Sequence, residues 1–88
     1  MTEKELSGAL TLKLLELYGL PDGIRTAGVV VPGIIKDFRS MLMKAETGRR
    51  IREEYRTEDL KAVISLCGCL DARGQAVFES FEVRPGKE

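Results

Sequence analysis

The two cysteines, Cys67 and Cys69, lie two residues apart around a glycine in the stretch ISLCGCLDARG. Thiolates bind zinc and carry redox chemistry. Alternate residues of a β-strand share a face, whereas two such residues in a helix point about 200° apart. Zinc needs four ligands, and the chain has neither a histidine nor a second cysteine pair to complete a site. A dimer that brings two such pairs together, or a further ligand such as Asp71, would extend this pair to a zinc or redox site. The alternative is that both cysteines are small, buried apolar residues.

No other residues form a catalytic set. The absence of histidine removes the commonest general base. Ser65, Ser80 and Tyr55 have no histidine or suitable lysine base beside them in the sequence, so nucleophilic catalysis lacks a partner residue. We expect no catalytic residues, no enzymatic activity and no cofactor apart from the zinc considered above.

The charge balance excludes further classes of protein. The 14 basic and 14 acidic residues cancel, which argues against a nucleic-acid-binding protein that works by neutralising phosphates. No apolar run approaches the roughly 18 residues that a membrane helix needs. The amino-terminal MTEKELSG is charged and lacks a signal-peptide pattern, so we expect a cytoplasmic protein with no membrane association.

The amino-terminal segment predicts a helix over Glu3–Tyr18. Thr2 and Glu5 form a capping-box pattern, in which each side chain satisfies a main-chain N–H of the other residue. Leucines follow at steps of four and three, as on one helix face. Gly19 and Pro21 then favour the end of the helix.

The next segment is more ambiguous. Three β-branched residues between breakers, GVVVPG, predict a short strand over Thr26–Val31, with an extended loop as the alternative. Apolar residues at helical spacing then predict a helix from Gly33 or Ile34 to Tyr55, with opposite charges four residues apart on its exposed face. Gly48 weakens that helix, and one helix ending there before another begins is the alternative.

The last third predicts a β-hairpin. In DARG, Asp71 and Gly74 occupy the first and fourth positions of a type I turn. Runs of β-forming residues on both sides predict strands at Ala62–Leu70 and Gln75–Val83. A helix over residues 58–68 that starts near Thr57 is the alternative.

Together these elements predict an α+β fold. The expected order is helix, strand, helix and hairpin (α-β-α-β-β), with the two helices packed on one face of a small sheet. We expect residues 1–88 to form a single domain with a polar tail at 84–88. Because a core of this size contributes little stability, we also expect a homo-oligomer.

One stretch resembles a known family. Residues 60–78, LKAVISLCGCLDARGQAVF, combine an apolar run, a D-x-x-G turn, a small apolar residue and Phe78. This pattern resembles one seen in some phage tail assembly chaperones, and the similar stretch covers under a quarter of the chain. The resemblance implies an assembly chaperone or small accessory factor.

The function we expect is a protein–protein interaction or assembly module that binds a protein partner and associates with itself. Methionine adapts to imperfect surfaces, arginines on one helix face attract an acidic partner, and the last strand offers an open edge. The candidate partner-binding residues on these grounds are Met41, Met43, Arg49, Arg52, Arg56 and Phe81. The alternatives are the thiol site at Cys67 and Cys69 and the assembly chaperone.

Overall fold

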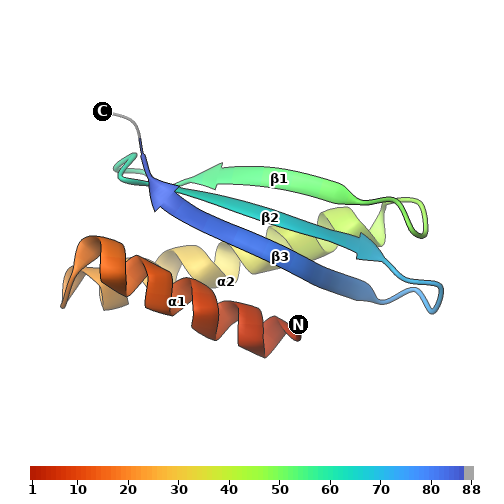
Figure 1. The fold of residues 1–88 in the computed structure, drawn as a ribbon, viewed down its shortest axis with the longest axis horizontal. Coiled ribbons are helices and arrows are strands. Elements are labelled where there is room, and N and C mark those ends of the chain that lie inside the picture. The colour runs from red at the N-terminus through yellow and green to blue at the C-terminus, as the bar shows by residue number, and fades with distance from the viewer. Residues whose placement is uncertain (87–88) are drawn as a thin grey trace.

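The computed structural model describes residues 1–86 and has two helices followed by a three-stranded antiparallel sheet. The elements are α1 (Glu3–Tyr18), α2 (Asp22–Met43), β1 (Ile51–Arg56), β2 (Ala62–Leu70) and β3 (Ala76–Pro85). Both helices lie on one face of the sheet, which leaves the other face open to solvent (Figure 1). The predicted α+β class is therefore confirmed, with its two helices on one face and its carboxy-terminal hairpin. Neither helix among residues 1–86 has the length and apolar character needed to cross a membrane.

Helix α1 has the predicted bounds and the predicted cap. The Thr2 hydroxyl accepts from the Glu5 N–H at 3.0 Å, and the Glu5 carboxylate accepts from the Thr2 N–H at 2.8 Å. The leucine stripe faces the sheet and the other helix, where Leu6, Leu10 and Leu14 are buried. This helix forms where local capping and burial favour the same conformation.

The strand predicted at Thr26–Val31 is wrong, because these residues belong to α2. The observed order is therefore α-α-β-β-β. Ala27 and Val31 are buried on the core-facing side of the helix, and this packing outweighs the β preference of valine. Pro32 cannot donate to the carbonyl of Gly28, but Gly28 is exposed and its carbonyl can bind water instead.

The long helix predicted to Tyr55 is also wrong. Helix α2 ends at Met43, Gly48 adopts a positive φ of 82° in the connection, and Ile51–Arg56 forms β1. In β1, residues alternate between the helix side and the open face. Residues four apart share a face in a strand as well as in a helix, so the spacing of apolar and charged residues did not distinguish the two.

The hairpin is confirmed. β2 has the predicted bounds, while β3 starts one residue later than expected and continues to Pro85. The Gly74 N–H donates to the Asp71 carbonyl at 3.0 Å, and Gly74 has the positive φ (79°) that this turn requires. The alternative helix over 58–68 does not form. Arg84 and Pro85 of the predicted tail belong to β3, and the end of that tail, 87–88, lies outside the described residues.

The sheet order is β1-β2-β3, with β2 in the centre. Ala62, Ile64 and Leu66 point from β2 into the core and are at most 1% exposed. They meet Phe38 and Leu42 of α2, which are also fully buried. Burying an isoleucine, leucine or phenylalanine side chain stabilises the fold by roughly 1.5–3 kcal/mol, so this layer is a substantial part of the hydrophobic core.

A β-bulge interrupts the pairing of β2 and β3. Cys67 lies opposite Ser80 and Gly68 lies opposite Phe78, which leaves Glu79 without a partner residue. Because the bulge adds one residue to β3, the side chains before and after it no longer follow a single in-and-out alternation. For this reason the Glu79 carboxylate lies beside Cys67 on the open face, whereas Phe81 packs against the core.

The bulge also explains Gly68. A Cβ atom at this position would collide with the carbonyl oxygen of Val77 and lie 3.3 Å from side-chain atoms of both Phe38 and Leu42. The residue is therefore glycine because the main chain of β3 and the side chains of α2 approach it closely.

We predict that Gly68→Ala lowers the free energy of unfolding by about 1–3 kcal/mol, because the added methyl overpacks the core beneath α2. The matched control is Gly8→Ala, since Gly8 is exposed on α1 with no neighbouring atom within 4 Å of a Cβ. The control should raise stability by up to about 1 kcal/mol through helix propensity. Urea titration measures both, and equal effects would contradict the close approach.

Candidate functional site

The two cysteines share one face of the sheet, as predicted for a strand, and this is the open face. Both are free and partly buried. Cys67 makes a long 3.9 Å contact with Oε1 of Glu79, which is ion-paired to Arg50 Nε at 2.9 Å. Within residues 1–86 no group of three or more potential metal ligands comes together. The zinc site therefore remains a prediction that needs a second chain.

Charged side chains flank the cysteines on this open face. Glu54 of β1 is ion-paired with Arg84 of β3 at 2.7 Å and with Arg56 at 3.2 Å. The hydrogen bond from Arg84 lowers the pKa of Glu54 below its ordinary value. Ser65 lies beneath these side chains and is only 4% exposed. These charged side chains form ion pairs with one another. Among the described residues of this face, they therefore do not point together toward a common ligand.

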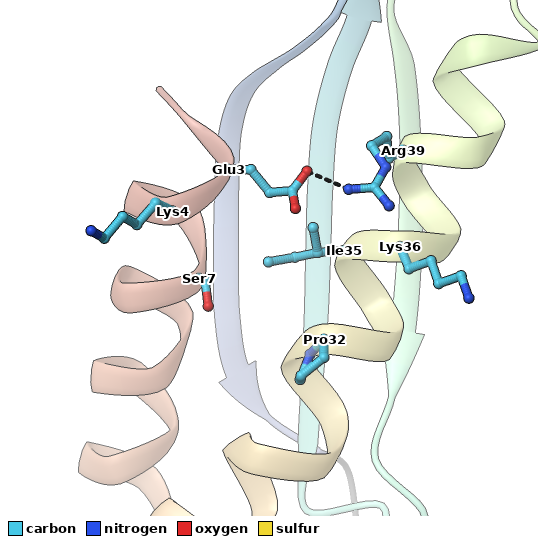
Figure 2. A pocket seen from close by; sticks show the side chains of 7 residues that line it. All are labelled: Glu3, Lys4, Ser7, Pro32, Ile35, Lys36 and Arg39. Carbon is cyan, nitrogen blue, oxygen red and sulfur yellow. Dashed lines mark hydrogen bonds and ion pairs between the residues drawn. The ribbon is translucent and has the colours of Figure 1, made fainter.

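A second hollow, of about 630 Å³, lies between the two helices. An ion pair of 2.6 Å between Glu3 and Arg39 spans it. Figure 2 shows that Lys4 and Lys36 point away from this hollow, so their charges do not converge on a common ligand. The hollow is a groove between packed helices. Glu3 and Arg39, which line it, are already paired with each other.

The third region lies between α2 and β1 and is called here the α2–β1 groove. It consists of two adjoining hollows of about 400 and 300 Å³ that share Val30, Thr57 and Glu58. Val29 lines its outer part and is 77% exposed. Gly33 of α2 and Tyr55 of β1 also line it. The groove thus combines an apolar helix surface with the edge of the sheet.

Tyr55 fixes the wall of this groove. Its hydroxyl donates to Asp37 Oδ2 at 2.7 Å and contacts the Met41 sulfur at 3.9 Å. Burial raises the pKa of Tyr55, and the Asp37 carboxylate raises it further, so the phenol remains protonated. This hydrogen bond ties β1 to α2 and holds the groove in one shape.

The turn between β1 and β2 fixes one end of the groove. The Tyr18 hydroxyl donates to Asp59 Oδ1 at 2.8 Å, and the Thr57 hydroxyl donates to the same oxygen at 2.6 Å. Thr57 also accepts from the Ala62 N–H at 3.2 Å, so it caps this turn rather than a helix. The bond from Thr57 and the Lys61 N–H lower the pKa of Asp59.

The outer edge of β1 is the most distinctive feature of the groove. Within residues 1–86, β1 pairs with β2 alone. The Thr57 N–H donates to the Ala62 carbonyl at 3.2 Å, and these residues continue the register of β1 and β2. Hydrogen-bonded pairs alternate in an antiparallel ladder. Glu53 and Tyr55 therefore direct their main-chain groups toward β2, whereas Glu54 and Arg56 direct theirs away from it.

The candidate partner-binding residues are dispersed over several surfaces. Arg52 and Arg56 lie exposed on the open face of β1, but Arg49 precedes the strand, so the single arginine face expected on a helix does not exist. Met43 is 54% exposed at the end of α2. Met41 and Phe81 are partly buried. Sequence reasoning missed the groove because it placed α2 and β1 in one helix.

We predict that Asp59→Asn destabilises the protein most at neutral pH. The pKa of Asp59 is lower in the folded chain than its ordinary value of about 4, so its stabilising effect is full above pH 4 and is lost as pH falls through the folded pKa. The difference between wild type and Asp59→Asn should therefore shrink in acid. Urea titrations between neutral pH and acid measure it, with Glu58→Gln as the neighbouring control. A difference independent of pH would contradict this role.

Comparisons of the chain with protein-family models, with curated proteins and with solved structures gave no match. The fold and the geometry of the α2–β1 groove are therefore the basis for the function proposed below.

Proposed function

We propose that this protein is a non-enzymatic interaction module that binds an extended protein segment by pairing it with β1. The observation that supports this most is the unpaired edge of β1 beside the α2–β1 groove. Addition of a strand to a sheet edge supplies affinity through main-chain hydrogen bonds, and a neighbouring groove accepts alternate side chains of the added segment.

The main-chain N–H and C=O groups of Glu54 and Arg56 point sideways from the edge of the sheet, away from β2. They can therefore form hydrogen bonds with such a segment. Each hydrogen bond formed contributes about 1 kcal/mol net. Side chains of the segment on the helix side would cover Val29 and Val30, and the burial of this apolar surface favours association. The charged side chains of β1 on the open face would select among segments by their charge pattern.

The other sheet edge is less suited to this role. β3 carries the bulge at Glu79 and ends at Pro85. Bulges and prolines are features that protect strand edges from further pairing. β1 is regular over its six residues and contains neither proline nor glycine. This difference favours β1 as the binding edge.

The proposal keeps the interaction role expected from the sequence and moves the binding surface from Met43 and Phe81 to β1. An assembly chaperone, as implied by the resemblance of residues 60–78, would be one form of such a module, and that form rests on the resemblance alone.

We predict that Glu54→Pro weakens binding at this edge while the fold persists. The N–H of Glu54 points away from β2, so proline removes a donor to the partner without removing a bond of the sheet. Glu54→Ala is the matched control, because it removes the same carboxylate and keeps the N–H. The measurement is selection of a random peptide library against wild type, followed by titration of the selected peptides against both variants.

Peptides that bind Glu54→Pro at least about fivefold more weakly than they bind Glu54→Ala would support the proposal, because the two variants differ in one main-chain donor and a hydrogen bond of about 1 kcal/mol is worth on the order of a fivefold change in affinity. Equal binding to all three proteins would show that the edge of β1 is not the site. Circular dichroism of Glu54→Pro checks that the fold is retained.

A thiol site is the second candidate function, favoured by the position of Cys67 and Cys69 on one open face. Two copies would have to pack open face to open face to bring four thiolates around one zinc ion. Zinc analysis of freshly purified protein tests this, and the expected result is stoichiometric zinc that is lost in Cys67→Ser. Protein without zinc, or zinc that Cys67→Ser retains, would remove this candidate.

A further inference from the structure

We infer that the segment that pairs with β1 is β1 of a second copy, arranged antiparallel about a two-fold axis perpendicular to the sheet and centred on Tyr55. This inference rests on the proposed function, because it names the partner of the same edge. It would join the two three-stranded sheets into one six-stranded sheet with all four helices on one side.

The direction of the main-chain groups restricts the pairing. Only residues that point outward can exchange hydrogen bonds with the second copy, and in β1 these are Arg52, Glu54 and Arg56. An antiparallel pairing that opposes at least two outward residues of β1 to outward residues of the second copy is centred on Glu53, on Glu54 or on Tyr55. Directly opposed residues share a face of the sheet, so the charges of β1 decide among these three arrangements.

The arrangement centred on Glu54 is unfavourable. It places Glu54 opposite Glu54 of the second copy and Arg52 opposite Arg56, so every pair on the open face has like charges. The arrangement centred on Glu53 pairs Arg52 with Glu54, but it also opposes Arg50 to Arg56 and one Glu53 to the other. Like charges directly opposite each other destabilise a sheet.

The arrangement centred on Tyr55 is complementary within β1. It places Glu54 of each copy opposite Arg56 of the other, so both charge pairs on the open face are attractive. Each opposite-charge pair across strands contributes roughly 0.2–1 kcal/mol. The Glu54 and Arg56 side chains are 42% and 56% exposed, so they can exchange their present partners for those of the second copy.

The helix beside β1 is compatible with the same two-fold axis. The axis brings the α2 helices of the two copies to the same side of the joined sheet, each next to the other's β1. Val29 is the most exposed of the large apolar side chains and lies on this side of α2. Gly33 lines the groove as well, and no atom lies within 4 Å of a Cβ built there, so nothing within the chain requires a glycine. A second copy would cover Val29 and use the space at Gly33.

The test uses two charge reversals on the full chain. Arg56→Glu leaves only glutamates at positions 54 and 56 of both copies, and Glu54→Arg leaves only arginines at these two positions. Each variant alone should self-associate at least about tenfold more weakly than wild type, because two attractive pairs become repulsive. An equimolar mixture should recover the dimer, since the two variants are complementary to each other. Sedimentation equilibrium over a wide concentration range measures all three samples.

Arg49→Glu is the matched control, because it makes the same charge change at an exposed residue that precedes β1. It should leave the dimer unchanged. Recovery in the mixture also shows that both single variants are folded. A tighter dimer of Arg56→Glu would overturn the inference in favour of the arrangement centred on Glu53, where Arg50 opposes position 56.

A wild-type protein that stays monomeric at every concentration would also overturn the inference. If that monomer still binds selected peptides in a manner sensitive to Glu54→Pro, the proposed function stands and its partner is a different protein. If it binds none, the proposed function falls as well.

Discussion

The burial of β2 beneath both helices is the constraint on which the rest of the structure depends. Ile64 and Leu66 are almost wholly enclosed, and Phe38 of α2 packs over the same strand. A strand buried in this way must lie in the centre of the sheet, so β1 and β3 become its edges. Gly68 lets β3 and α2 approach β2 closely, and the bulge that accompanies this contact distorts β3. β1 is therefore the regular edge.

Hydrogen bonds from two tyrosine hydroxyls hold the β1 edge in place. Tyr55 bonds to Asp37 of α2, and Tyr18 bonds to the turn that follows β1. Each tyrosine buries an apolar ring and directs its hydroxyl to a carboxylate at the surface, which satisfies the polar atom. These two contacts give β1 and the α2–β1 groove a defined shape before any partner binds, and a preformed site loses less entropy on binding.

Edge pairing and a shared zinc site require different dimers. In a dimer paired through β1, the two β2 strands are separated by three strand spacings, about 14 Å. Zinc–sulfur bonds are about 2.3 Å long, so the cysteines of the two copies could not share one ion. Cys67 and Cys69 would then remain on the open face of the joined sheet. The interaction function and the thiol function therefore predict different assemblies of the same chain.

The sequence predicted those elements whose local signals agree with their packing. Thr2 and Glu5 define the start of α1, and Asp71 and Gly74 define the hairpin turn, because caps and turns are short-range chemistry. The segment GVVVPG was misassigned because its local preference is for a strand, whereas burial of Val31 against distant residues selects a helix. β1 was missed because charges four residues apart fit a helix and a strand equally well. The candidate site is formed by α2 and β1, and neither element was predicted correctly. Of its residues, only Arg52 and Arg56 were therefore identified from the sequence.

The most direct measurement of the central claim is amide hydrogen exchange in β1, followed residue by residue by NMR at increasing protein concentration. The amides of Glu53 and Tyr55 point toward β2 and should be protected at every concentration. The amides of Glu54 and Arg56 point outward, so they should exchange fast in dilute protein and become protected as β1 pairs with a second copy. Outward amides that exchange equally fast at all concentrations, in a sample that nevertheless dimerises, would contradict pairing through β1.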